Sequence, residues 1–175
     1  GFSPVRRYWE MRREGEIAPD EPEVPSGFSV RSFNRGDESL LTQVQNDAFA
    51  GSWGFCPNTV EEITHRTRMV GGSPEGILFL LRDGEGAAYC WTRIEGDGTE
   101  RTGTICMTGV VPSFRGLGLG RTVLLASMGY LHSQGVEATE LTVDERNTPA
   151  TDTYIAVGFR KVSENVWYEQ RLEPP

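Results

Sequence analysis

Three alternating glycines form the most chemically suggestive feature of the sequence, in the segment Arg115-Gly116-Leu117-Gly118-Leu119-Gly120-Arg121. Glycine lets a backbone turn tightly and approach a ligand without side-chain clash. The segment lies between a strand pattern and a helix pattern, so its amides and the positive end of the helix would form a cradle for a pyrophosphate. Its spacing matches neither the Walker loop nor the dinucleotide fingerprint. A plain strand-to-helix turn is the alternative interpretation.

A second group of residues lies downstream, in Asn147-Thr148-Pro149-Ala150-Thr151-Asp152-Thr153-Tyr154-Ile155-Ala156-Val157-Gly158-Phe159. Pro149 suits the first turn of a helix. Ala150 and Tyr154 would then lie one turn apart on the same face, where the small residue leaves a slot with a hydroxyl at its end. On the pattern alone, an ordinary core tyrosine is the better interpretation of Tyr154.

The elements that position these two motifs alternate between strands and helices. The apolar and turn patterns predict helices over residues 37–49, from about Thr59, over 118–134 and over 149–157. They predict strands over residues 28–33, 77–81, 87–94, 104–111, 139–143, 159–163 and 166–172. This order indicates a mixed α/β fold.

The first 27 residues have a different character from the rest. Residues 1–14 predict a short strand, and residues 15–27 form a Pro/Glu-rich linker, because dense prolines block helix and sheet. Gly1-Phe2-Ser3-Pro4-Val5, followed by Trp9, is similar to Gly158-Phe159-Arg160-Lys161-Val162, followed by Trp167. Residues 1–14 are therefore either the final strand of an upstream domain of the same kind as residues 28–175, or a chance likeness.

Composition and charge narrow the classes of partner and the compartment that the chain could have. The 175 residues are enough for one domain with a real core, and a net charge of −8 disfavours nucleic acid while suiting an amine acceptor. No apolar run approaches the roughly 20 residues of a membrane span, and no secretion leader is recognised. Three cysteines without CxxC spacing favour the cytoplasm, and no structural metal is expected. A start at Gly1 suggests a fragment of a longer polypeptide.

Taken together, the two motifs resemble the GNAT superfamily of acyl-CoA N-acyltransferases over residues 28–172. The family's cofactor loop, Arg/Gln-x-x-Gly-x-Gly/Ala, is matched by Arg115, Gly118 and Gly120. Its later motif, Asn-x-x-Ala-x-x-x-Tyr-x-x-x-Gly-Phe, is matched by Asn147, Ala150, Tyr154, Gly158 and Phe159. The resemblance implies a twisted mixed sheet of about six or seven strands, flanked by about four helices, with a splay between its two central parallel strands.

The resemblance also implies a role for each matched residue, with acetyl-CoA as the default donor and no metal. Val110 and Val111 would pair with the pantetheine arm through their backbones, and the amides of residues 116–121 would hold the pyrophosphate, helped by Arg115 and Arg121. Asn147 would contact the pantetheine region or order the loop, and Ala150 would lie against the cofactor. Tyr154 would be the general acid to the departing thiolate, since their basicities are comparable.

The acceptor side is less determined. Asp144 is the first candidate for the base that takes the amine's proton, and Glu145 the second, because both follow a strand next to the expected splay. Solvated turn carboxylates are the alternative. Further candidates are Thr108, Cys106 and Glu95, while Trp53, Phe55 and Trp91 would line the acceptor pocket or pack in the core.

The expected function is transfer of an acyl group, acetyl by default, to a primary amine by direct attack in a ternary complex. The expected partners are a small-molecule amine, and an upstream GNAT domain or a second copy as a packing surface. More loosely, residues 53–55 and 141–144 resemble the C-terminal domain of tandem, mycothiol synthase-like acetyltransferases. The main alternative is a CoA-binding, non-catalytic module, and a nucleotide-dependent oxidoreductase is a distant third.

Overall fold

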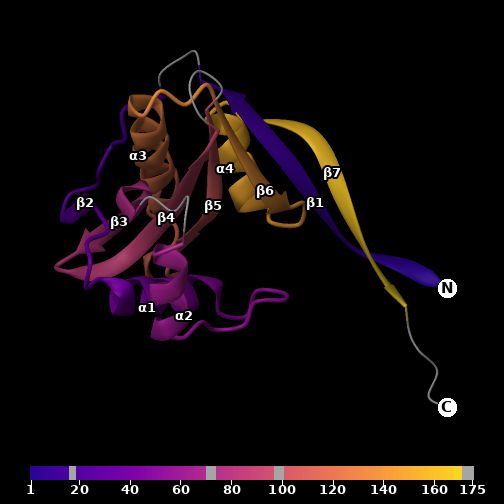
Figure 1. Ribbon diagram of the computed structural model, residues 1–175, viewed down its shortest axis with the longest axis horizontal. Coiled ribbons are helices and arrows are strands. Elements are labelled where there is room, and N and C mark those ends of the chain that lie inside the picture. Colours follow the sequence, from indigo (N-terminus) through magenta and orange to yellow (C-terminus); the bar gives the residue numbers. More distant parts are fainter. Residues whose placement is uncertain (16–18, 70–73, 97–100, 171–175) are drawn as a thin grey trace.

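The computed structural model describes residues 1–15, 19–69, 74–96 and 101–170. Parts of the expected linker, of the turn after Glu95 and of the last predicted strand lie outside these ranges. Seven strands form one sheet in the order β2-β3-β4-β5-β6-β1-β7 (Figure 1). Their bounds are β1 Phe2–Glu14, β2 Phe28–Ser32, β3 Ile77–Arg82, β4 Glu85–Glu95, β5 Thr102–Val110, β6 Ala138–Asp144 and β7 Arg160–Gln170.

Four α-helices cover the two faces of this sheet: α1 Glu38–Phe49, α2 Val60–Thr67, α3 Leu119–Ser133 and α4 Thr148–Ala156. Gly109 on β5 lies against Ala48 of α1, whereas Gly103 on the same strand lies against Leu131 of α3. A side chain at either position would collide with the helix, since its Cβ would come within 2.8 Å of the nearest atom. Helices α1 and α3 therefore pack closely on opposite faces, and the mixed α/β fold with about four flanking helices is confirmed.

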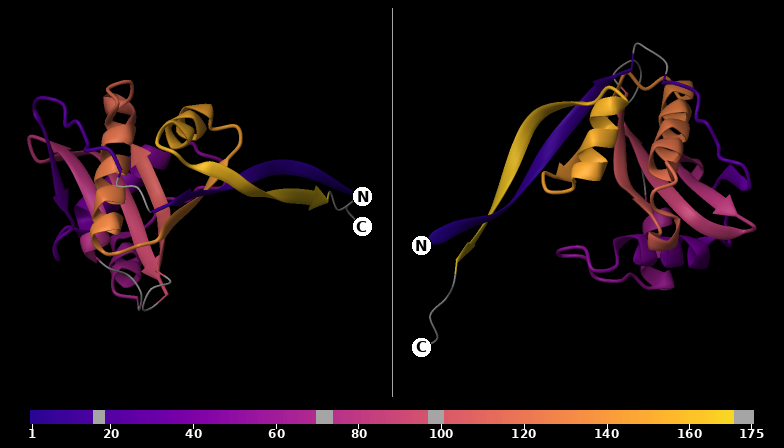
Figure 2. Two further views of the ribbon diagram at one scale, coloured as in Figure 1. Left: turned by 90° about the horizontal axis from the view of Figure 1, so that it is seen from above. Right: turned by 180° about the vertical axis from the view of Figure 1, so that it is seen from behind.

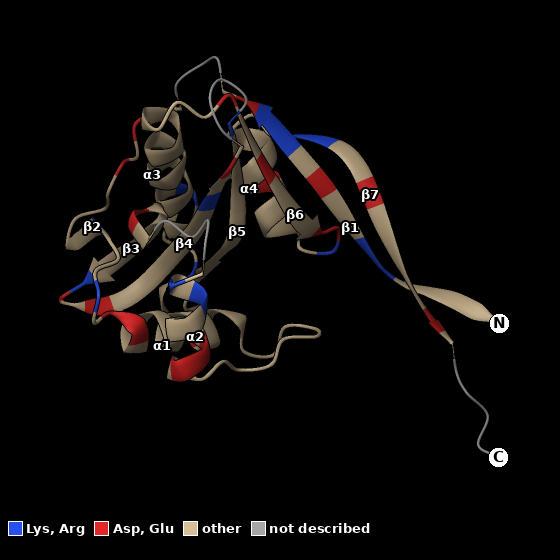
Figure 3. Cartoon of the chain, in the orientation of Figure 1, with Lys and Arg blue, Asp and Glu red and all other residues tan. Residues whose placement is uncertain are grey.

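Local sequence signals explain where the helices begin. Thr59 accepts a hydrogen bond from the Glu62 amide, and the Glu62 side chain accepts one from the Thr59 amide, so α2 starts with a capping box. Asp37 stands at the start of α1, as expected, but its carboxylate pairs with Arg31 instead of capping the helix. Glu38 lies in the first turn of α1, and Glu61 and Glu62 lie in the first turn of α2 (red in Figure 3), where the helix dipole favours acidic side chains.

Strands β1 and β7 form a long ribbon that extends away from the body of the molecule (Figure 2). Strand β1 lies between β6 and β7 and is antiparallel to both. Met11, in its inner half, is almost fully buried in the core. The N-terminal strand is thus an integral part of this sheet, although it precedes β2 by a linker.

The C-terminal end of the chain departs from its prediction. Two strands separated by a turn near Glu164 and Asn165 were expected, but Arg160–Gln170 is a single strand. The side chains of Glu164 and Asn165 bond across to Arg7 and Glu10 of β1, so the pairing continues through the expected turn. Because β1 supplies hydrogen-bonding partners for both side chains, the two residues are accommodated in an extended strand.

Candidate functional site

The two parallel strands of the sheet, β5 and β6, pair along only part of their length. Their register runs from Thr102 opposite Ala138 to Ile105 opposite Leu141, and stops there. Beyond this point the strands diverge, as the predicted splay requires. A β-bulge marks the same place, because Trp91 pairs with Met107 and Thr92 with Ile105, which leaves Cys106 as the extra residue. Bulges bend a strand and redirect its side chains.

The backbone of β5 beyond the bulge presents hydrogen-bonding groups to this splay. The amide of Val111 donates to the carbonyl of Ala87 on β4 at 2.9 Å, so Val111 faces β4 and not the splay. In an antiparallel ladder the alternate residues point the other way, which turns the backbone groups of Val110 and Thr108 toward the splay. Of the two valines expected to pair with a pantetheine arm, only Val110 has this orientation, and Thr108 shares it.

The glycine-rich loop joins the end of β5 to α3 in the expected place. Gly116 and Gly118 adopt φ angles of 81° and 76°, a left-handed conformation that favours glycine. Phe114 and Leu119 are buried and anchor the loop on either side. The first amides of a helix have no intrahelical partner, so the residues that open α3 supply free donors at the positive end of its dipole. The loop has the features of an anion cradle.

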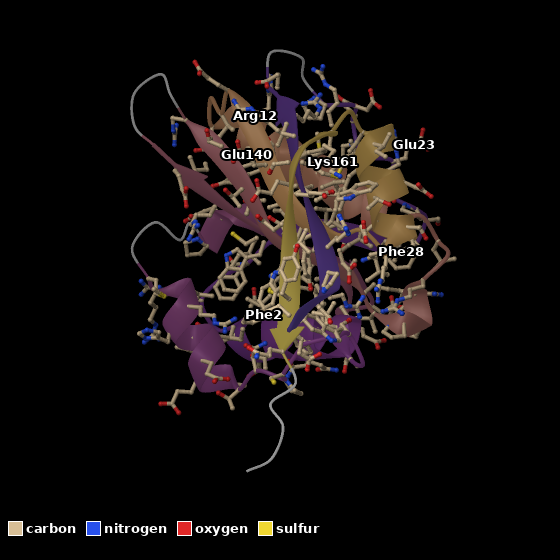
Figure 4. All side chains as sticks on the ribbon, turned by 90° about the vertical axis from the view of Figure 1, so that its right-hand side faces the viewer. Phe2, Arg12, Glu23, Phe28, Glu140 and Lys161 are labelled. Atoms are coloured by element: carbon tan, nitrogen blue, oxygen red, sulfur yellow. The ribbon has the colours of Figure 1, made fainter. Side chains whose placement is uncertain are left out.

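The two arginines that flank the loop have different surroundings. The guanidinium of Arg115 donates to the carbonyls of Val110 and Ala48, at 3.2 and 3.0 Å, and so ties the loop to β5 and α1. Arg121 is about half exposed and pairs with Asp20 of the linker at 3.2 Å. Two linker residues therefore lie beside the start of α3. Asp20 pairs with Arg121, and the carbonyl of Glu23 (labelled in Figure 4) accepts a hydrogen bond from the Thr122 hydroxyl.

Tyr154 lies on the α3 and α4 face of the sheet, with its ring buried. The ring packs edge-on against Phe159 at 6.0 Å. Burial raises the pKa of Tyr154 well above its ordinary value, and the nearby Cys90 thiol adds to the shift. Cys90 on β4 is itself fully buried, and burial raises its pKa to about 12 despite the neighbouring Ser127 and Thr108 hydroxyls. Both groups therefore stay protonated at neutral pH.

The segment between β6 and α4 is built by Asn147. Its amide donates to the Asp144 carbonyl at 2.9 Å, and its own carbonyl accepts from the amides of Ala150 and Thr151. Its side chain is exposed and makes no hydrogen bond with any described residue. Ala150 is half-buried and stands one turn before Tyr154, as the sequence spacing predicts. The backbone of Asn147 thus orders the turn, and its side-chain carboxamide is left available to bind a ligand.

The two candidate bases lie at the end of β6, beyond the point where its pairing with β5 stops: Asp144 is the last residue of the strand and Glu145 follows it. One carboxylate oxygen of Asp144 accepts from Arg6 of β1 at 2.8 Å, and the other accepts from the Arg146 amide at 2.9 Å. Both oxygens are thus engaged. The side chains of Arg6 and Asp144 are 17% and 22% exposed, so the pair is mostly buried. Glu145 is half-buried, and its amide bonds to the Arg7 carbonyl.

Aromatic side chains from distant parts of the sequence meet beside this ion pair. Trp53, in the loop between α1 and α2, lies under the Arg6 guanidinium at 5.0 Å and edge-on to Trp167 of β7 at 6.1 Å. Trp167 in turn contacts Tyr8 of β1 at 6.2 Å. Trp53 and Trp167 are each about half exposed. The structure thus places Trp53 at the surface.

The other aromatic and polar candidates have other surroundings. Phe55 packs on Phe49 of α1 at 5.5 Å, and Trp91 is buried in the core. Cys106 is exposed at the bulge, and Glu95 pairs with Arg93 near the far end of β4.

The sequence analysis did not single out Arg6 and Tyr8, which the structure places beside Asp144 and Trp167. Both belong to β1, and the likeness of its residues to 158–167 had left two interpretations open, the final strand of an upstream domain or a chance likeness. Arg6, Tyr8 and Glu10 alternate along β1, and this period of two was the signal that one face of the strand carries polar and aromatic groups.

The described part of the chain holds no group of three or more His, Cys, Asp or Glu side chains placed to bind a metal ion. None of its helices combines the length and apolar character that crossing a membrane requires.

Comparison with known proteins bears on the same features. The model of the acetyltransferase (GNAT) family matches residues 39–159, which include β5, the glycine-rich loop, α3 and the Asn147–Phe159 motif. The chain belongs to this family. The family assignment made from the two motifs is thereby confirmed.

Individual relatives agree with the family assignment. A mycothiol acetyltransferase from Stackebrandtia nassauensis is 36% identical over 98% of the chain and 57% of its own length. A mycothiol acetyltransferase from Thermomonospora curvata is 34% identical over 97% of the chain and 57% of its length. The crystal structure of a GCN5-related N-acetyltransferase from Sphaerobacter thermophilus superposes with a TM-score of 0.81 at 27% identity, covering 96% of this chain and 52% of that one. The chain therefore spans a little over half the length of these relatives.

Proposed function

We propose that this chain transfers an acetyl group from acetyl-CoA to a primary amine, by direct attack of the amine within a ternary complex. The observation that carries the proposal is the place where β5 and β6 part. Pairing ends at Ile105 and Leu141, and the two strands then continue, no longer paired with each other, to the glycine-rich loop after β5 and the Asn147–Phe159 motif after β6. In the proposed site the anion cradle, the unpaired strand edges and the protonated Tyr154 hydroxyl would all face the point where the two strands part.

The donor would be held by backbone groups. The pantetheine arm carries amides that would pair with the backbone of Val110 and Thr108, as an added strand pairs with a sheet edge. The amides of residues 116–121 would bind the pyrophosphate, and Arg121 would add a charged contact by exchanging its exposed pair with Asp20 for the ligand. Arg115 would act by holding the loop in shape, since its donors already bond to Val110 and Ala48.

Tyr154 would donate a proton to the thiolate as it leaves. Its raised pKa keeps the hydroxyl protonated at neutral pH, and no described residue bonds to that hydroxyl. The thiolate gains the proton on sulfur, and the tyrosinate regains one from solvent. A proton donor in position contributes to the rate because charge on the departing sulfur is neutralised as it develops.

The amine would approach from the side of β6 and β1. Asp144 remains the first proposed base, acting through a water because both of its oxygens already have a partner. Glu145 is the second. An acidic chain, with a net charge of −8, favours the approach of a cationic amine. The relatives named mycothiol acetyltransferases make mycothiol-related amines the first acceptors to try.

The proposal is tested by measuring CoA release from acetyl-CoA with a panel of small primary amines and mycothiol-related amines. We expect amine-dependent release, with the acetylated amine detected by mass spectrometry. If acetyl-CoA binds but no amine on the panel accelerates its breakdown, the chain is a CoA-binding module and the enzymatic proposal is wrong. The chain spans a little over half the length of its relatives. A longer protein, in which the chain is joined to a segment corresponding to the rest of a relative, is therefore assayed in parallel.

A further inference from the structure

The loop between α1 and α2, residues 50–58, reaches from the end of α1 to the β1–β7 ribbon, where Trp53 contacts both strands. Its base is fixed by a pair of hydrogen bonds, in which Asn46 donates to the Asn58 carbonyl at 2.9 Å and accepts from the Asn58 amide at 2.8 Å. Its middle is held by Phe55 stacked on Phe49. Its tip, Trp53, leaves the helices and contacts β1 and β7.

The tip contact depends on one cation. The Arg6 guanidinium lies over the Trp53 ring at 5.0 Å and at the same time donates to Asp144 at 2.8 Å. A guanidinium stacks on an aromatic face and bonds a carboxylate with different parts of its surface, so a single Arg6 can serve both. The neighbouring Arg7 makes a more exposed pair with Glu164 instead, and is not part of this contact.

The loop has the means to move about its fixed base. Gly51 and Gly54 flank the tip with φ angles of 75° and 73°, in open space. Trp53 is half exposed and touches the ribbon through its ring, while the Ser52 and Phe55 amides bond to carbonyls close by in sequence. Few long-range backbone bonds oppose a displacement of the tip, so the Trp53 contacts decide whether the tip stays docked.

We propose that Arg6 is a positioning residue that couples the docked state of the loop 50–58 to the carboxylate of Asp144, and that the loop gates the acceptor side of the splay. The inference rests on the proposed function in one respect, namely that the amine acceptor binds on this side of the splay. Docking places Trp53 against Arg6, and Arg6 holds one oxygen of Asp144. Undocking opens the route between the loop and the ribbon and frees Arg6 to move from the carboxylate.

The coupling is measured first without any substrate, by amide hydrogen exchange followed by NMR. Arg6→Met keeps most of the side chain's length and removes its charge. We expect exchange at Ser52 and Phe55 to accelerate roughly three- to thirtyfold, the range that loss of a cation–π contact supports, while the Asn58 amide at the loop base is unchanged. Arg6→Lys should restore much of the protection. Arg7→Met, from the adjacent residue, is the matched control and should leave all three amides unchanged.

Coupling is then separated from simple loss of packing. Trp53→Leu alone, and together with Arg6→Met, completes a double-mutant cycle in which a shared contact gives effects that do not add. Additive effects, an unchanged loop in Arg6→Met, or equal acceleration at Ser52, Phe55 and Asn58 would each overturn the inference.

The same variants are read out in catalysis once an accepting amine is known. We expect Arg6→Met to raise the KM for the amine and lower kcat, with the affinity for acetyl-CoA within twofold of the wild type, and Arg6→Lys to recover part of both. A changed affinity for acetyl-CoA with an unchanged amine KM would contradict an acceptor-side gate. The exchange experiment needs no turnover, so failure of the proposed function would leave the loop coupling measurable on its own.

Discussion

Replacing Tyr154 by phenylalanine removes one hydroxyl and leaves the aromatic ring in place. The ring carries the packing, since it is buried and contacts Phe159 at 6.0 Å, whereas no described residue bonds to the hydroxyl. We therefore expect the free energy of unfolding to change by less than about 1 kcal/mol. Tyr154→Ala would also remove the ring, at a cost of about 3 to 5 kcal/mol, and is unsuitable for this purpose.

The catalytic effect should be far larger than the effect on stability. Loss of a general acid lowers a rate by roughly 100- to 10,000-fold, which corresponds to about 2.7 to 5.5 kcal/mol of transition-state stabilisation. The affinity for acetyl-CoA should hardly change, because the binding groups proposed for the donor lie on β5 and the glycine-rich loop. Turnover would fall without a matching rise in the donor's dissociation constant.

The assay follows CoA release with an accepting amine and measures donor affinity separately by calorimetry. Tyr168→Phe is the control, because Tyr168 lies exposed near the outer end of β7, and it should retain wild-type turnover. A Tyr154→Phe variant that turns over within threefold of the wild type, with intact donor binding, would refute the acid role. Another proton source would then have to serve the leaving thiolate.

Three further predictions concern the loop, a buried thiol and a helix cap. Gly118→Ala should destabilise the fold by about 1 kcal/mol and weaken acetyl-CoA binding, because φ is 76° at this position, whereas Gly120→Ala, which meets only Val110 at 3.5 Å, should be tolerated in both respects. Urea titrations and calorimetry on the two variants decide this, and equal behaviour would argue against the backbone explanation. Cys90, with its pKa raised from 9.0 to about 12, contributes stability that is complete below pH 9 and is lost as pH rises toward 12. About 1.4 kcal/mol of this contribution should be lost between pH 8 and pH 10, and that share of the loss should be absent in Cys90→Ser, while the share from other groups with raised pKa, such as Tyr154, stays. Thr59→Ala should cost about 0.5 to 2 kcal/mol by removing the capping box, with acetyl-CoA affinity unchanged; a change in that affinity would mean that α2 reaches the donor site.

Local motifs explain why much of the donor side could be predicted from sequence. The positive φ angles of Gly116 and Gly118, and the turn built by Asn147, depend on residues within one short segment each. The spacing from Ala150 to Tyr154 likewise needs only the helix period. In these segments the residue types largely determine the local backbone geometry, so the geometry can be predicted without knowledge of the rest of the fold.

The acceptor side could not be predicted in the same way, because its contacts join distant parts of the chain. Arg6 and Asp144 are 138 residues apart, and Trp53 meets Trp167 across the sheet. Which strand lies beside β6 depends on competition among strands, and the sequence pattern of residues 1–14 does not reveal that they enter this sheet. The interpretation of 164–165 as a turn failed for the same reason, since cross-strand partners on β1 satisfy both side chains. Whether β1 also belongs to an upstream domain stays a prediction.

The most direct test of the account is a calorimetric titration of acetyl-CoA into the folded chain. The account predicts saturable binding at one site per chain, weakened in Gly118→Ala and by rising salt, because backbone amides and Arg121 would bind a charged diphosphate. Absence of heat and of any rise in melting temperature at millimolar acetyl-CoA, in a sample that unfolds cooperatively, would contradict it.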